Sequence, residues 1–151
     1  MTIFDELGNI YNEIDNTYSK QEIQARTRGF LKKESEYSRK RQLNDQSYFL
    51  FMFTRLEDRI RTLSENLIDS KVTTLTDWKN KRTWDILHKR KDNIPLMDRV
   101  ALLTKINGAD YQLINNYYKQ RNSIGHGGAF TIPINIPTVI TDFKRLYNDL
   151  K

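Results

Sequence analysis

The sequence predicts an all-α protein, a bundle of about five or six helices. Proline and glycine are unfavourable inside helices, and residues 1–94 contain no proline and only Gly8 and Gly29. Apolar residues recur at intervals of three and four along several segments, as they do on one face of a helix. Cysteine is absent from all 151 residues, which excludes disulfides, thiol nucleophiles and cysteine-based zinc sites. We expect a single domain over residues 1–151, with residues 1–44 as an N-terminal helical extension and 45–150 as the core bundle.

The first half of the chain is expected to contain three helical segments. Residues 3–18 predict an amphipathic helix whose apolar face carries Ile3, Leu7, Ile10, Ile14 and Tyr18. Residues 20–44 are polar and charged, and we expect a helix with a thin apolar stripe. The clearest helix covers residues 46–68, with Asp45 as its N-cap. Its stripe consists of Phe49, Met52, Phe53, Leu56, Ile60, Leu63 and Leu67, and the added apolar residues Tyr48, Leu50 and Phe51 indicate a central position for its beginning.

The second half is expected to contain shorter helices. Thr73–Thr76 interrupts the pattern, and a basic helix with Trp78 and Trp84 follows over residues 77–91. Pro95 precedes a short helix, 96–107, closed by Asn107-Gly108. The next helix opens at Ala109-Asp110 and ends in Gly125-His126-Gly127-Gly128. Residues 129–137 alternate apolar and polar and contain two prolines, which indicates an extended loop or an edge segment. Pro137 suits the first turn of a last helix over 138–150.

Positive charge is concentrated in two segments. The formal net charge is +6, residues 19–44 carry eight bases against three acids, and residues 76–91 carry six against two. Such patches attract polyanions through a sequence-independent interaction. A solvated helix face explains either patch as well, and Trp78 and Trp84 fit core packing or an interface better than base stacking.

The residues best suited to chemistry lie in one string, Tyr117-Tyr118-Lys119-Gln120-Arg121-Asn122-Ser123-Ile124-Gly125-His126-Gly127. Asn122 and His126 share a helix face because they are four residues apart, and Arg121 flanks that face. Gly125 leaves space beside the arginine. An arginine binds phosphate, a histidine moves a proton near neutral pH, and an asparagine can orient either a ligand or the imidazole. The set suits metal-free phosphodiester cleavage with a ribose 2′-hydroxyl as the nucleophile. A helix C-terminus that favours cations and is closed by glycine explains part of the same string.

Arg121-Asn122-x3-His126, followed by Gly127, resembles the Arg-x4–6-His motif of the HEPN superfamily. The string RNSIGHG is similar to the form found in bacterial HEPN ribonucleases of toxin and abortive-infection systems. The resemblance implies an all-α bundle of four to five helices and two protomers whose motifs face each other in one cleft. It also implies metal-independent RNA cleavage that leaves a 2′,3′-cyclic phosphate and a 5′-hydroxyl. Gly128 stands where members paired with a nucleotidyltransferase carry a tyrosine, which speaks against control by modification of that residue.

The resemblance gives each candidate residue a role. Arg121 would bind the scissile phosphate, His126 would act as general acid/base, and Asn122 would orient His126 or the phosphate. Glu57 would be the acidic residue that the family often carries on an earlier core helix. RNA would be guided by the basic residues of the second patch and by those of 32–41; the candidates of the second patch are Lys79, Lys81, Arg82, Lys89, Arg90 and Lys91. No cofactor or metal is expected. The expected partners are RNA, a second copy of the chain, and an antitoxin or regulatory protein.

Two other function classes remain open on the sequence. The chain could be a non-catalytic HEPN-like module that binds RNA, a nucleotide or a protein. It could also be a helical adaptor or immunity protein whose basic faces dock an acidic partner. No apolar run is long enough to span a membrane, and the N-terminus MTIFDELGN lacks the pattern of a signal peptide. We therefore expect no membrane partner and a cytoplasmic location.

Overall fold

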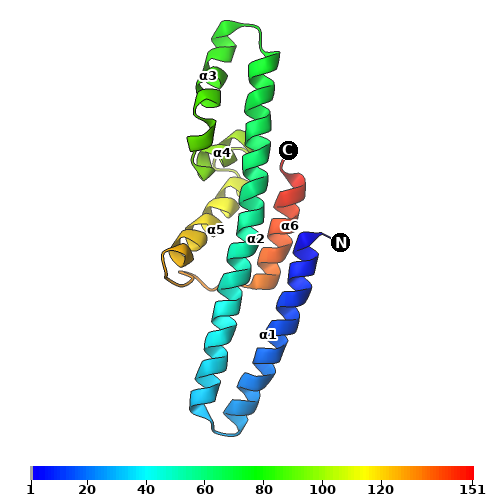
Figure 1. Cartoon of the computed structure of the whole chain (residues 1–151), viewed down its shortest axis with the longest axis vertical. Helices are drawn as coiled ribbons and strands as arrows, with labels where there is room; N and C mark the ends of the chain where they lie inside the picture. Colours follow the sequence, from blue (N-terminus) through cyan, green and yellow to red (C-terminus); the bar gives the residue numbers. More distant parts are fainter. Residues whose placement is uncertain (1) are drawn as a thin grey trace. The chain divides into compact units, whose positions relative to one another are not determined.

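The chain consists of helices joined by turns and loops, as the computed structural model shows for residues 2–151, which it describes. Its helices are α1 (Ile3–Thr27), α2 (Leu31–Thr74), α3 (Trp78–Lys89), α4 (Leu96–Leu103), α5 (Ala109–Gly125) and α6 (Ile136–Asp149), and a 3₁₀ turn, η1 (Lys91–Asn93), follows α3 (Figure 1). No strand is present within residues 2–151. For the part of the chain that the structure describes, the predicted all-α fold class is therefore confirmed, with six α-helices.

The helices build two compact units. The first unit comprises the chain up to Phe53 together with Lys119–Arg145, and the second comprises Thr54–Tyr118 together with Leu146–Lys151. Helices α2, α5 and α6 each contribute to both units. The segment 1–44, expected as an N-terminal extension, belongs to the same unit as Arg121, Asn122 and His126.

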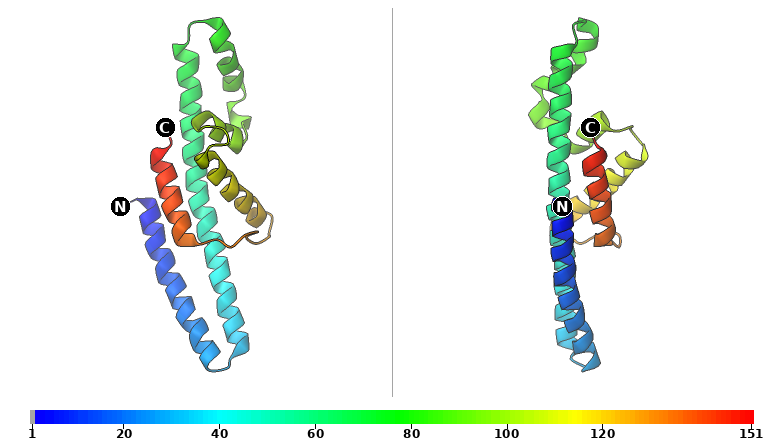
Figure 2. Two further views of the ribbon diagram at one scale, coloured as in Figure 1. Left: turned by 180° about the vertical axis from the view of Figure 1, so that it is seen from behind. Right: turned by 90° about the vertical axis from the view of Figure 1, so that its right-hand side faces the viewer.

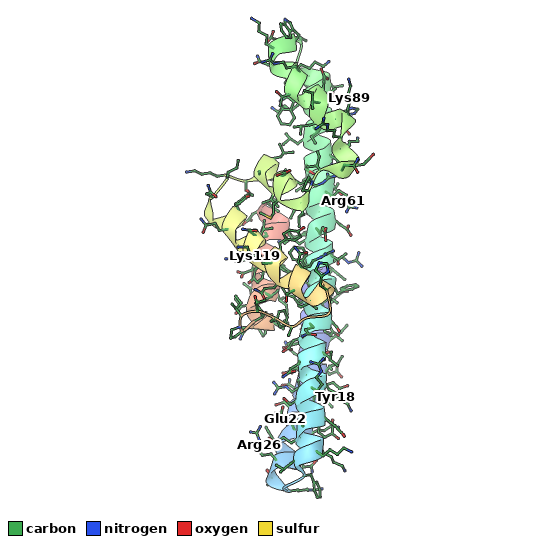
Figure 3. The ribbon with its side chains drawn as sticks, turned by 90° about the vertical axis from the view of Figure 1, so that its left-hand side faces the viewer. Tyr18, Glu22, Arg26, Arg61, Lys89 and Lys119 are labelled. Carbon is green, nitrogen blue, oxygen red and sulfur yellow. The ribbon has the colours of Figure 1, made fainter. Side chains whose placement is uncertain are left out.

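In the first unit α1 and the beginning of α2 form an antiparallel hairpin, which Figure 2 shows side by side. The Tyr11 hydroxyl donates to Asp45 Oδ1 at 2.8 Å. Arg41 bridges two acids of α1, with Nε 2.8 Å from Asp15 Oδ1 and Nη1 3.1 Å from Glu22 Oε2. These contacts between charged and polar groups join two helices that few apolar residues connect at this level. Figure 3 labels three α1 residues of this part of the hairpin, Tyr18, Glu22 and Arg26.

Two predicted helix boundaries differ from those of the hairpin. The chain turns at residues 28–30, so residues 20–44 are split between α1 and α2 and do not form one helix. Asp45 lies inside α2, so the expectation that it is an N-cap is wrong. Its carboxylate accepts the Tyr11 hydrogen bond instead, and burial raises the pKa of Asp45 above its usual range.

The buried face of α1 is also offset from the face that the apolar spacing indicated. Phe4, Gly8 and Tyr11 are buried, whereas Ile3 and Ile10 are 38% and 48% exposed. Helix α6 sets this orientation, because a Cβ at Gly8 would stand only 3.2 Å from Ile140 Cδ1. The glycine thus lets the two helices approach closely.

An ion pair joins the same two helices, with Lys144 Nζ 2.6 Å from Asp5 Oδ1. The hydrogen bond from Lys144, followed by the one from the Thr2 backbone N–H, lowers the pKa of Asp5 to about 2. Asp5 is therefore ionised at neutral pH and the pair is charged on both sides.

Phenylalanine rings form the core of the first unit. Phe49, Phe53 and Phe143 are fully buried, and their ring centroids lie 5.9–6.1 Å apart. The ring of Phe130 meets Phe49 edge to face at 5.3 Å, a favourable geometry for aromatic pairs. Phe51 is 44% exposed, so only part of the apolar beginning of the predicted 46–68 helix lies in the core.

In the second unit α2 continues its apolar stripe, with Leu56, Ile60 and Ile68 fully buried. Helix α4 is shorter than expected: it begins after Pro95 and ends at Leu103, and Asn107 adopts a positive φ of 62° in the turn before α5. Pro137 stands in the first turn of α6, as predicted. Within residues 2–151 no helix combines the length and apolarity needed to cross a membrane.

A buried arginine holds the loop between α3 and α4. Arg99 is 4% exposed and donates to the Ile94 carbonyl at 3.1 Å, to Ser64 Oγ at 3.1 Å, to Glu65 Oε1 at 3.2 Å and to the Lys91 carbonyl. One guanidinium therefore connects α2, η1 and α4. Sequence reasoning missed it, because Arg99 is one of many charged residues in the chain and nothing in the local pattern marks it as buried.

Candidate functional site

The predicted chemical residues gather at the C-terminal end of α5, in the first unit. Arg121 and Asn122 are half-buried, and Arg121 Nη1 donates to Asn122 Oδ1 at 3.3 Å. His126 is exposed and follows Gly125, the last helical residue. No hydrogen bond of its imidazole is seen to any described residue. In the structure the Asn122 side chain thus hydrogen-bonds to Arg121. The expectation that Asn122 orients His126 stays a prediction.

The side of α5 next to the guanidinium is open at Gly125. A Cβ built there would lie 3.9 Å from Arg121 Nη1 and within 4 Å of no other atom outside the helix backbone. Figure 3 labels Lys119, which lies on α5 two residues before Arg121. Arg121 therefore extends along the last turn of α5 toward the histidine end of the helix.

His126 is the C-cap of α5, and its backbone is held by three hydrogen bonds around it. The His126 N–H donates to the Asn122 carbonyl at 3.1 Å, the Gly127 N–H to Ile124 at 2.9 Å and the Gly128 N–H to Ser123 at 3.0 Å. Gly127 adopts a φ of +82°, which favours glycine. This is the Schellman arrangement of a helix end. Gly127 and Gly128 are therefore explained by the geometry of the helix end, and the position of His126 is fixed by backbone hydrogen bonds.

Alanine substitutions at Gly127 and Gly125 should have different effects on stability, because Gly127 forms the helix cap and Gly125 lies on the open side of α5. Gly127→Ala should lower the free energy of unfolding by about 1 kcal/mol, because an alanine is strained at positive φ. Gly125→Ala should leave it unchanged or raise it by up to about 1 kcal/mol, because alanine is the better helix former and nothing obstructs its methyl group. Urea unfolding of both variants measures the difference. Equal losses at the two positions would contradict the assigned cap.

The loop after the cap is fastened to α5 by two polar side chains. Gln120, 4% exposed, accepts from the Thr131 N–H at 2.8 Å and donates to Thr131 Oγ1 at 2.7 Å. Ser123 Oγ donates to the Ala129 carbonyl at 2.7 Å. Between this loop and α2 lies a groove of about 460 Å³, lined by Gln42, Asp45, Gln46 and residues 129–134. Sequence reasoning missed Gln120, which no motif distinguishes from a surface glutamine.

Glu57 is not part of the first unit. It is half-buried on the part of α2 that belongs to the second unit and lines a cavity of about 70 Å³ with Arg61, Asp92 and Arg99. Its carboxylate is thus among charged residues of α2, η1 and α4. Its role in the motif stays a prediction.

The predicted RNA-contacting residues lie on α3, on η1 and, for Arg90, at the junction between them, in the second unit. Lys79, Arg82, Lys89 and Arg90 are exposed, and Lys81 is half-buried. Lys91 is already paired, with Nζ 3.0 Å from Asp69 Oδ2, so it contributes less to a positive surface than the exposed bases do.

The two tryptophans of α3 differ in exposure. Trp78 is 64% exposed and Trp84 is half-buried. Of the two expectations for Trp78, core packing is therefore wrong, because α3 contributes no buried residue, while an interface stays a prediction. His88 is exposed, and its Nε2 lies 3.4 Å from Asp69 Oδ1. Within residues 2–151, no three His, Asp or Glu side chains gather closely enough to hold a metal ion.

Comparisons of the chain with protein-family models, with curated proteins and with solved structures gave no match. The functional interpretation therefore depends on the residues at the end of α5 and on the charged surface of α3.

Proposed function

We propose that the chain is a metal-independent endoribonuclease of the HEPN type, with Arg121 and His126 in a cleft completed by a second copy. The observation that supports the proposal is that a guanidinium and an exposed imidazole lie around the last turn of one helix. The Arg121 guanidinium is oriented by Asn122 Oδ1, and His126 is exposed on a backbone-fixed cap.

Cleavage of the RNA backbone requires a cation that binds the phosphate and a group that transfers protons. Arg121 presents a planar fork that can bind two phosphate oxygens and stabilise the charge that develops on them. His126 can take the proton of the ribose 2′-hydroxyl as its oxygen attacks phosphorus. The bond from phosphorus to the 5′-oxygen then breaks, the leaving oxygen takes up a proton, and a 2′,3′-cyclic phosphate and a 5′-hydroxyl remain.

A second copy supplies the second imidazole. Attack and departure occur on opposite sides of phosphorus, so one group removes a proton while another donates one. Each chain has two histidines, and His88 belongs to the other unit, beside Asp69. Two copies of His126 would provide the base and the acid. A cytoplasmic defence or toxin role, with an antitoxin or regulatory protein as partner, belongs to the same proposal.

Cleavage of a mixed single-stranded RNA panel in EDTA tests the proposal. We expect His126→Ala to cleave at least about a hundredfold more slowly than the unaltered chain, the usual contribution of a general acid/base. The variant should unfold at the same temperature, because the imidazole makes no hydrogen bond to a described residue. The products should carry cyclic phosphate ends.

His88→Ala is the matched control, since it removes the other imidazole. It should cleave at the rate of the unaltered chain. Equal cleavage by His126→Ala and the unaltered chain, or cleavage only when a divalent metal is added, would refute the proposal.

One observation favours the non-catalytic module as a second candidate. Asn122 Oδ1 accepts from Arg121, and no described side chain orients the His126 imidazole by a hydrogen bond. A site of that kind binds phosphate without turning it over. It predicts RNA binding with no cleavage in any protein, and a larger loss of affinity for Arg121→Ala than for His126→Ala.

A further inference from the structure

We propose that Trp78 is a stacking platform for an unpaired base of single-stranded RNA, with the exposed bases of α3 contacting the adjoining phosphates. This adds to the proposed function a second RNA contact, on α3 and outside the α5 motif. The choice of RNA as the nucleic acid rests on the proposed function.

The exposure of Trp78 is the first support. Its side chain is 64% exposed at the first position of α3. An indole is the largest apolar side chain, and leaving it in water forgoes the stabilisation that its burial would give. Trp84, six residues later, is half-buried, so the two indoles of the helix are not equivalent. Trp78 therefore has a large surface available for a ligand.

The arginine beside the indole is the second support. The guanidinium of Arg82, one turn along α3, lies 5.8 Å from the centroid of the Trp78 ring. It lies over one face of the ring, which leaves the other face for a base and keeps a phosphate-binding group beside the indole. A base stacked on the indole would thus have its phosphate within reach of a cation.

The charge around Trp78 is the third support. Residues 76–91 carry six bases against two acids, and Lys79, Arg82, Lys89 and Arg90 are exposed. One of the two acids, Asp77, is engaged as the N-cap of α3, where its side chain accepts from the Asn80 N–H at 3.2 Å. Lys79 and Arg82 lie in the first turns of α3 with Trp78, and Lys89 and Arg90 extend the positive charge to the other end of the helix, so the exposed surface along α3 suits a polyanion.

The combination favours single-stranded nucleic acid over other partners. Stacking on an indole requires an unpaired base, because the bases of a duplex already stack on each other. Lysines are depleted at protein–protein interfaces, whereas an exposed lysine, Lys79, follows Trp78 directly and bases outnumber acids by six to two over residues 76–91. A single strand satisfies both the apolar and the cationic parts of the surface.

Tryptophan fluorescence gives a direct test, because the chain contains two tryptophans. All proteins carry His126→Ala, so that RNA is not consumed if the chain cleaves it. We expect a short oligo(U) strand to quench the fluorescence of the Trp84→Phe variant, in which Trp78 is the remaining indole. The Trp78→Phe variant, which keeps Trp84, should show little quenching.

Affinity for labelled oligo(U), measured by fluorescence anisotropy, gives the size of the contact. Trp78→Ala should weaken binding by about five- to a hundredfold, the usual effect of removing one stacked base contact, while Trp78→Phe should retain most of the affinity. Ile86→Ala, which removes another exposed apolar side chain of α3, is the matched control and should bind as before. Arg82→Ala should also flatten the dependence of affinity on salt, whereas Trp78→Ala should not.

The outcomes separate this inference from the proposed function. Quenching and a Trp78-dependent affinity would support the platform even if no protein cleaves RNA. Unchanged affinity in Trp78→Ala, tighter binding of an RNA duplex than of oligo(U), or a preference for oligo(dT) over oligo(U) would overturn it, even if the unaltered chain is an active ribonuclease.

Discussion

Arg99→Ala should lower the free energy of unfolding by about 3–5 kcal/mol, because two carbonyls lose their donor, at about 1–3 kcal/mol each, and the packing of a buried side chain is lost as well. Arg99 is 4% exposed, and its guanidinium donates to two side chains of α2 and to the carbonyls of Lys91 and Ile94. Alanine would leave these carbonyls without their donor and Glu65 without its cation. Chemical denaturation monitored by circular dichroism measures the change.

Arg61→Ala is the matched control for Arg99. Arg61 lines the same small cavity but is exposed, so its removal should change stability by no more than about 0.5 kcal/mol. Glu65→Gln should cost less than Arg99→Ala, because the amide oxygen can still accept from the guanidinium. Similar stabilities for Arg99→Ala and Arg61→Ala would show that the buried hydrogen bonds of Arg99 do not hold the loop between α3 and α4.

Phe49→Ala should lower the free energy of unfolding by a similar amount, about 3–5 kcal/mol. Its ring is fully buried and contacts Phe53, Phe130 and Phe143 at centroid distances of 6.1, 5.3 and 6.0 Å. The substitution would open a cavity where α2, α6 and the loop after the α5 cap meet. Because this cost is comparable to the whole stability of many domains, the variant should be studied at low temperature.

Phe51→Ala, two residues along α2, controls for the loss of an aromatic ring. Phe51 is 44% exposed, and the substitution should cost less than about 1 kcal/mol. If Phe51→Ala cost as much as Phe49→Ala, the core of the first unit would not be centred on the phenylalanine cluster described above.

Most helices could be predicted from the sequence because their boundaries depend on local chemistry. Pro95 precedes α4 and Pro137 stands in the first turn of α6, as predicted, whereas Thr73 and Thr74, expected to interrupt the helical pattern, belong to the end of α2. The hairpin of α1 and α2 was divided incorrectly, because its connection contains one glycine and its polar part is held by the pairs of Arg41 with Asp15 and Glu22. Ion pairs between helices leave no apolar periodicity, so no pattern along the chain reveals them.

The candidate site was predictable only in its outline. The spacing of Arg121, Asn122 and His126 placed them around the end of one helix, and the structure puts them at the end of α5. The hydrogen bond between Arg121 and Asn122 and the attachment of the following loop by Gln120 depend on side-chain rotamers and on residues distant from the motif. For Trp78 the sequence favoured core packing or an interface because tryptophan is usually buried, and its exposure on a helix without buried residues excludes the core.

The cap at the end of α5 makes the histidine dispensable for folding. The hydrogen bonds that end the helix use backbone atoms of His126, Gly127 and Gly128, and the positive φ falls on Gly127. Any residue that tolerates the C-cap conformation could replace His126 without disturbing the turn. A selection for stable, well-expressed variants would therefore retain Gly127 and let position 126 vary. A selection for activity would retain both Gly127 and His126. Which of these two patterns a mutational screen returns would show whether the imidazole is there for chemistry.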